Sequence, residues 1–137
     1  MTLRGEGHFE RCDAAVRRVL GTFDRAGQPT VHPRARFVAM SLFFYVKHFA
    51  QSAGHLPAAA AAAGGGNGSG GESTLASAAA LREAARALCE YDDAKLRTLV
   101  GRDPLTTEDA LRWRCFDLTY AARLLTDGYG FEAEACL

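Results

Sequence analysis

The chain has no excess of charge of either sign, and this absence argues against one class of protein. Lysine and arginine together number 16, as do aspartate and glutamate, so the formal net charge is zero. A neutral chain gives no reason to expect the salt-dependent phosphate binding of a nucleic-acid protein. The arginine clusters Arg17-Arg18 and Arg34/Arg36 are therefore interpreted as solvated faces, and no nucleic-acid partner is expected.

The sequence also has no apolar run long enough to cross a membrane. The longest run, from Phe37 to Val46, is about half of the ~20 residues that a spanning helix needs, and Lys47 ends it. The first eleven residues are polar and lack the apolar centre of a signal peptide. We therefore expect any export signal or membrane anchor to lie outside this chain.

Cysteines are few, and their spacing gives no metal-binding motif. Cys12, Cys89, Cys115 and Cys136 form neither a CxxC pair nor a Cys/His ligand set, so no metal site is expected. Four cysteines allow three complete pairings, and the sequence alone does not choose among them. In an oxidising compartment, a bond between Cys89 and Cys115 would close a loop of about 26 residues and contribute about 3–4 kcal/mol. In the cytosol the same cysteines would be buried thiols.

At 137 residues the chain is at most one domain of ordinary size, or a piece of a larger one. Its composition divides it into residues 1–56, residues 57–72 and residues 73–137. The middle part is alanine followed by glycine, can bury almost nothing and is interpreted as a flexible insertion. Its glycine run lacks the preceding strand and the lysine of a phosphate-binding loop.

The first part predicts a helix, a short strand and a second helix. The first helix lies within residues 5–23, and the strand is expected at Phe37–Met40. Ser41 is a plausible N-cap for the second helix, which covers residues 42–49. That helix is apolar on two faces, so we expect it to pack against two neighbours.

The last part predicts two helices. The first runs from about Ser73 to Tyr91, with its arginines outward and four apolar positions inward. The second starts after Pro104 with a near capping box at residues 106–109, and Gly128 is expected as its left-handed C-terminal cap. The inward positions are Ala78, Leu81, Ala85 and Leu88 on the first helix and Leu111, Cys115, Leu118, Ala122 and Leu125 on the second.

Three segments resemble, in order, motifs of the apyrases, which hydrolyse nucleoside tri- and diphosphates. The first is Gly5-Glu-Gly-His-Phe-Glu-Arg-Cys12, and the second is Arg36-Phe-Val-Ala-Met-Ser-Leu-Phe-Phe-Tyr45. The third runs from Trp113 to Phe131 and ends in a Gly-Tyr-Gly-Phe turn. The resemblance implies a helix-rich α/β fold, here part of the C-terminal lobe of a two-lobed, actin/RNase H-like nucleotide phosphatase. It also implies the lumen of the secretory pathway (Golgi or ER) or the extracellular space.

In that family a Ca²⁺ or Mg²⁺ ion assists the attack of water on the terminal phosphate, with a glutamate as general base. The phosphate-binding loops and the glutamate segment have no counterpart in this sequence. We therefore expect no catalytic residue in this chain and no turnover from it alone. The nucleotide substrate and a separate N-terminal lobe are the partners that the resemblance implies.

The residues with which the family binds the nucleobase do have counterparts in this sequence. The resemblance implies that the nucleobase is held between Tyr129 and a ring of the aromatic stretch, either Tyr45 or Phe44. Trp113, Tyr120 and Phe131 are expected to be packing residues. No catalytic role is expected for Asp117 or Asp127.

The resemblance also bears on the cysteines, since Cys89 and Cys115 resemble the last disulfide of the family. Cys12 lacks the neighbouring cysteines that the family usually has.

Two other functions were considered, and the first of them remains open. The chain could be a non-catalytic helical interaction module whose aromatic residues form its core. A catalytic histidine paired with a cysteine is not expected, because the four histidines are scattered and no nucleophile context surrounds them. These are His8, His32, His48 and His55.

Overall fold

The computed structural model describes residues 7–22, 40–57 and 76–134, and in these ranges the chain is helical and forms no strand. The helix-rich part of the fold expectation is therefore confirmed. The strand expected at Phe37–Met40 lies outside the described residues except for Met40, and most of the insertion at 57–72 lies outside them as well. The two-lobed architecture remains a prediction.

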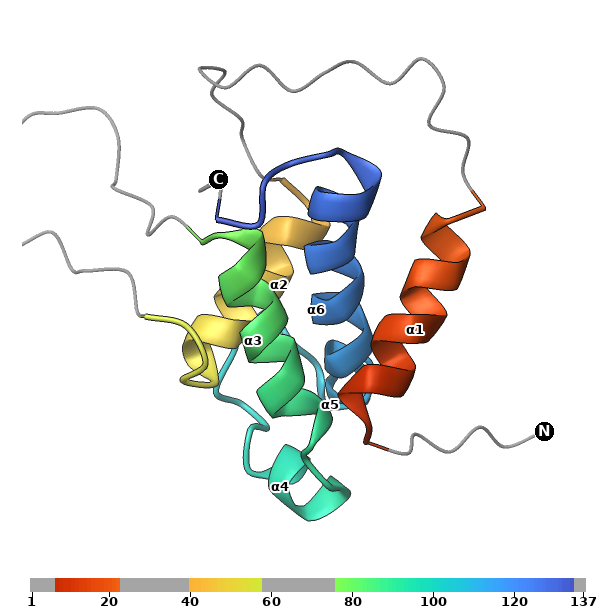
Figure 1. Ribbon diagram of the computed structural model, residues 1–137. Helices are drawn as coiled ribbons and strands as arrows, with labels where there is room; N and C mark the ends of the chain where they lie inside the picture. The colour runs from red at the N-terminus through yellow and green to blue at the C-terminus, as the bar shows by residue number, and fades with distance from the viewer. Residues whose placement is uncertain (1–6, 23–39, 58–75, 135–137) are drawn as a thin grey trace, which may run out of the picture.

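Helix α6 (Arg114–Arg123) lies at the centre of the structure, and three other helices pack around it. Figure 1 shows α1 (Phe9–Leu20) on one side of α6, with α2 (Leu42–Ser52) and α3 (Ala78–Cys89) on the other. Helices from residues 1–56 and from residues 73–137 therefore share one hydrophobic core.

The buried face of α3 is the one that the apolar spacing predicted. All four expected inward residues are buried, together with Ala84 and Cys89. Alanines on this face let α6 approach closely, and the Cα atoms of Cys89 and Cys115 are 4.8 Å apart. The helix begins after Ser77, whose Oγ accepts a hydrogen bond from the backbone N–H of Ala80 at 3.1 Å.

The expected start of α2 is right, but the expected cap is wrong. Ser41 precedes Leu42, yet its side chain makes no capping hydrogen bond and its φ is 52°. Along α2 the buried residues are Val46, Phe49 and Ala50, which face the core. Leu42 and Phe43 also pack against the core, and α2 contacts two neighbours, α3 and α6, as expected. Phe44 and Tyr45 are both exposed.

The single long helix expected after Pro104 is broken into pieces. Helix α4 (Asp93–Arg97) lies before Pro104, and the expected helix is divided into the short α5 (Glu108–Leu111) and α6, which starts only at Arg114. The expected capping box does not form: Thr107 is the residue before α5 and makes no capping bond, and the Thr106 hydroxyl donates to the Asp103 carboxylate. Arg114 donates to Thr106 Oγ1 at 2.7 Å, which ties the start of α6 to this loop.

The inward positions predicted for this region nevertheless lie in or against the core, since Leu111, Leu118, Ala122 and Leu125 are buried and Cys115 packs on them. Across the described residues, no helix has the length and the apolar character needed to span a bilayer.

Candidate functional site

Tyr129 lies at the end of a π-helical turn that continues α6. This turn, η1 (Leu124–Gly128), is followed directly by the tyrosine, whose backbone N–H donates to the carbonyl of Leu124 at 2.8 Å. A turn of this kind adds one residue to the helical repeat and so changes the direction of the side chains that follow it. The Tyr129 side chain is 49% exposed. The ring is therefore backbone-anchored and open to solvent.

The glycine that takes the left-handed conformation is Gly130, with φ of 76°, and not Gly128 as expected. Gly128 lies inside η1, where an added Cβ would come within 2.7 Å of the Leu124 Cδ1 atom. The π-helical turn moves the chain reversal two residues along, because the helix has not yet ended at Gly128. Phe131 then packs against the core as a partly buried ring, as the sequence suggested.

The ring beside Tyr129 is Phe43 of α2. The two ring centroids are 6.5 Å apart and the planes are inclined by 52°, which is a direct aromatic contact. A nucleobase between two parallel rings needs a spacing of about 7 Å, twice the stacking distance of ~3.4 Å. The observed rings are instead inclined and touch each other, so they do not form an open base-binding slot in this structure.

Phe44 and Tyr45, the two partners expected for Tyr129, contact each other, and Phe44 also contacts His48 one turn further on. The centroids of Phe44 and Tyr45 are 5.5 Å apart, and those of Phe44 and His48 are 6.0 Å apart. Both rings remain accessible. The role of either ring in base binding stays a prediction.

Of the three residues expected to be packing residues, Trp113 is exposed, whereas Tyr120 and Phe131 are partly buried. Trp113 lies in the break between α5 and α6 and is 52% exposed. Phe116 is also exposed, and it stacks on Tyr120 with centroids 5.8 Å apart and planes inclined by 15°.

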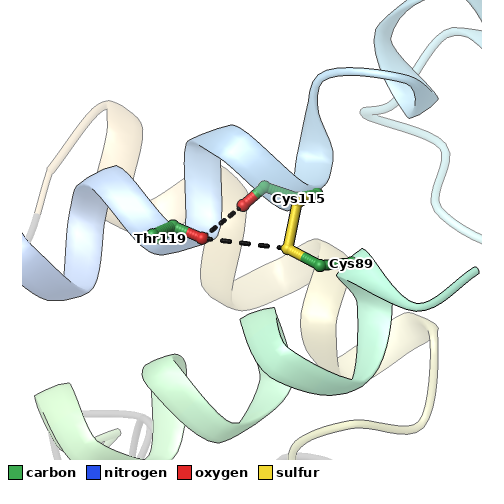
Figure 2. The surroundings of a disulfide bond; sticks show 3 residues. All are labelled: Cys89, Cys115 and Thr119. Atoms are coloured by element: carbon green, nitrogen blue, oxygen red, sulfur yellow. Dashed lines mark hydrogen bonds between the residues drawn. A yellow bond between two sulfur atoms is a disulfide. The ribbon is translucent and has the colours of Figure 1, made fainter. Parts of the chain in front are cut away.

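Cys89 and Cys115 form a disulfide, which confirms the pairing that the resemblance implied. The bond joins the end of α3 to the beginning of α6, as Figure 2 shows. Thr119, one turn along α6, donates its hydroxyl hydrogen to the Cys115 carbonyl at 2.7 Å. The same hydroxyl lies 3.9 Å from the Cys89 sulfur. The disulfide thus lies at the contact between α3 and α6, the most extensive helix pair of the described structure.

The described side chains do not fit the Ca²⁺ or Mg²⁺ ion that the resemblance implies. In ranges 7–22, 40–57 and 76–134, the one grouping of three or more potential ligands consists of Cys12, Cys89 and Cys115. Hard divalent cations take oxygen ligands, whereas sulfur suits softer ions. Two of these sulfurs are also joined in the disulfide.

A buried ion pair between α1 and α6 was not foreseen from the sequence. Arg123 donates from Nε and Nη2 to the two carboxylate oxygens of Asp13, at 2.6 and 2.7 Å. The hydrogen bond from Arg123 lowers the pKa of Asp13 against the opposing effect of burial. Arg123 also donates to Asp127 at 3.4 Å, which gives that residue a structural role. No local pattern could have revealed a pair separated by 110 positions.

A second buried carboxylate, Asp103, was also missed. It is 2% exposed and bonds to His48 Nδ1 at 2.8 Å, to the backbone N–H of Leu105 at 3.0 Å and to the Thr106 hydroxyl. Burial raises the pKa of Asp103, but these hydrogen bonds outweigh it, and the pKa is lowered. The bond to Leu105 is an Asx-turn, for which an Asp before a proline is a usable sequence signal.

The carboxylate of Asp103 fixes the orientation of the His48 ring, which is itself partly exposed. Asp117, at the other side of the loop, is paired with Arg114 at 3.1 Å. Burial raises the pKa of Asp117 despite this arginine. Asp103 therefore fastens α2 to the loop that joins α4 to α6, whereas Asp117 pairs with an arginine of its own helix, α6.

No protein-family model matches the chain, and no curated protein or solved structure matches it either. The resemblance to the apyrases therefore rests on the three sequence segments and stays a prediction.

Proposed function

We propose that this chain is the base-binding part of a nucleoside phosphatase and that Tyr129 is its stacking platform. One observation carries the proposal, namely that the tyrosine is anchored by η1, half exposed and in contact with a second ring, Phe43. Every nucleobase presents a π-face, so stacking on these rings would tolerate several bases. Because the two ring planes are inclined by 52°, the Tyr129 ring would have to rotate before the pair could enclose a base.

The groups that hydrolyse the phosphate would come from a separate N-terminal lobe. The loops that hold the phosphates, the general base and the Ca²⁺ or Mg²⁺ ion belong to an N-terminal lobe that completes the actin/RNase H-like architecture. Groups that meet the developing charge on the phosphoryl oxygens provide most of the transition-state stabilisation in such reactions. The chain alone therefore binds nucleoside di- or triphosphates without hydrolysing them.

The proposed location is the lumen of the secretory pathway or the extracellular space. The Cys89–Cys115 disulfide supports this, because structural disulfides persist in oxidising compartments.

Calorimetric titration of the whole chain with GDP, UDP and ADP tests the proposal. Replacing Tyr129 with alanine removes one stacked ring, worth about 1–3 kcal/mol, so Kd should rise about 5- to 150-fold for all three nucleotides. Phe43→Ala should have a similar effect. Phe116→Ala is the matched control, since this ring is equally exposed but lies against Tyr120, and it should leave Kd unchanged.

Phe44→Ala and Tyr45→Ala decide which ring of the aromatic stretch acts with Tyr129. If either variant weakens binding as much as Phe43→Ala, the slot is wider than the contact with Phe43 suggests. If the unmodified chain binds none of the nucleotides, or if Tyr129→Ala binds them equally well, the proposed function is wrong.

A helical interaction module remains the second candidate, and a different surface favours it. Val100, Leu105, Trp113 and Phe116 are all exposed apolar residues, and they belong to the segments from the end of α4 to α6. Where exposed apolar residues form one contiguous patch, the patch marks a contact surface between proteins. Trp113→Ser combined with Phe116→Ser should abolish self-association or partner binding without changing nucleotide affinity if this surface is the functional one.

A further inference from the structure

Three sulfur atoms meet where α1, α3 and α6 come together. The Sγ atoms of Cys12, Cys89 and Cys115 all lie within 4.8 Å of one another, although only the last two are bonded. Cys12 is a free, partly buried thiol on α1. The beginning of α1 is also seated against the end of α3, since a Cβ added to Gly7 would lie 3.1 Å from the Cys89 carbonyl oxygen. The free thiol is therefore held beside the disulfide by the packing of the helices.

The two bonded cysteines occupy opposite helix ends. Cys89 is the last residue of α3, and Cys115 is the second residue of α6. A thiolate is stabilised at a helix N-terminus and destabilised at a C-terminus. When the disulfide is attacked, the better leaving group is the sulfur whose thiolate is the more stable. Cys115 is therefore the leaving sulfur, and Cys89 is the sulfur that is attacked.

The surroundings of Cys12 control how much of its thiolate is present. Burial raises the pKa of the Cys12 thiol, a hydrogen bond with Thr119 opposes this rise, and the Asp13 carboxylate adds to it. That carboxylate is bonded to Arg123 of α6 and lies 4.0 Å from Arg82 of α3. The two arginines offset part of the negative charge that Cys12 would otherwise meet. The thiol is therefore a slow but competent nucleophile.

We propose that Cys12 and the Cys89–Cys115 disulfide form an internal thiol–disulfide exchange site. The Cys12 thiol loses its proton to solvent, and the thiolate donates an electron pair to the Cys89 sulfur. The bond between Cys89 and Cys115 breaks, and its electron pair leaves on the Cys115 sulfur, which takes up a proton. One disulfide and one thiol are present before and after, so no external oxidant or reductant is needed. The covalent link moves from α3–α6 to α1–α3 and leaves a partly exposed thiol at Cys115.

The test uses the whole chain with Cys136→Ala, which removes the one cysteine outside the described residues. The protein is incubated without added thiol at about pH 8.5, near the pKa of a free thiol, then acidified, unfolded and alkylated. Trypsin places Cys12, Cys89 and Cys115 on separate peptides, so mass spectrometry identifies the alkylated residue. We expect the label on both Cys12 and Cys115, in amounts within about tenfold of each other, because helix termini shift thiolate stability only modestly. A label found on Cys12 alone after prolonged incubation would overturn the proposal.

Two further variants control for unfolding and for chance oxidation. In Cys12→Ser with Cys136→Ala, Cys115 should stay unlabelled, and a labelled Cys115 there would show that no attack by Cys12 is needed. In Cys115→Ser with Cys136→Ala, oxidised glutathione should produce a Cys12–Cys89 disulfide. Glutathione caps on both cysteines, with circular dichroism still helical, would show that the two sulfurs do not meet. None of these outcomes depends on nucleotide binding.

Discussion

Replacing Arg123 with methionine tests how strongly the buried ion pair joins α1 to α6. The substitution keeps most of the side-chain volume but removes both short hydrogen bonds to Asp13, which is itself buried. Removing one partner of a buried pair costs about 3–5 kcal/mol, because the other charge is left without compensation. Arg17 and Arg82 remain 3.5 and 4.0 Å from the carboxylate. We therefore expect a loss of about 3 kcal/mol, at the lower end of that range.

Urea unfolding followed by circular dichroism measures this loss. With an m-value of about 2 kcal/mol/M, the midpoint should fall by about 1.5 M. Arg17→Met is the control, since this arginine is largely exposed, and it should cost no more than about 0.5 kcal/mol. The double variant Asp13→Leu with Arg123→Met replaces the pair with apolar groups and should lie within about 1 kcal/mol of the original chain. A loss below about 1 kcal/mol for Arg123→Met, or additive losses in the double variant, would refute the reasoning.

Three further predictions follow from the same packing. The pKa of Asp13 is lowered in the folded state, so the stability that the Asp13 carboxylate contributes is complete above the ordinary pKa of 3.8 and is lost as the pH falls through the pKa of the folded state. Urea midpoints should therefore drop more steeply on acidification for the original chain than for Asp13→Leu with Arg123→Met. Replacing both Cys89 and Cys115 with alanine opens a loop with a sequence separation of 26 and should cost about 3.5 kcal/mol, whereas an unchanged midpoint would mean that the loop is already constrained in the unfolded chain. Gly130→Ala forces a side chain onto a φ of 76° with open space around it, so it should cost about 1 kcal/mol through strain alone, and a thermal unfolding midpoint equal to that of the original chain would contradict this.

Sequence periodicity alone was sufficient to identify the amphipathic helices and the face of each that is buried. The inward positions of α3 were identified because the apolar residues between Ala78 and Leu88 recur at helical spacing, and helix packing buries whichever face is apolar. Local chemistry was a poorer guide to helix ends. The hydroxyl of Thr106 was expected to cap a helix, but its oxygen accepts a hydrogen bond from Arg114 and its proton goes to the buried carboxylate of Asp103. A cap is a single hydrogen bond, and one tertiary partner is enough to displace it.

The sequence by itself determined that the residues the structure describes are rich in helix, that α1 and α3 each have one apolar face, and that Tyr129 follows a helix and is flanked by glycines. Only the tertiary structure decided which ring lies beside Tyr129, because the π-helical turn rotates it toward Phe43 of α2. It alone also brought Asp13 to Arg123, and Cys12 to the disulfide. The physical reason is that periodicity records which face of each helix is buried, whereas these contacts depend on the angles and heights at which the helices pack, and no local pattern encodes those.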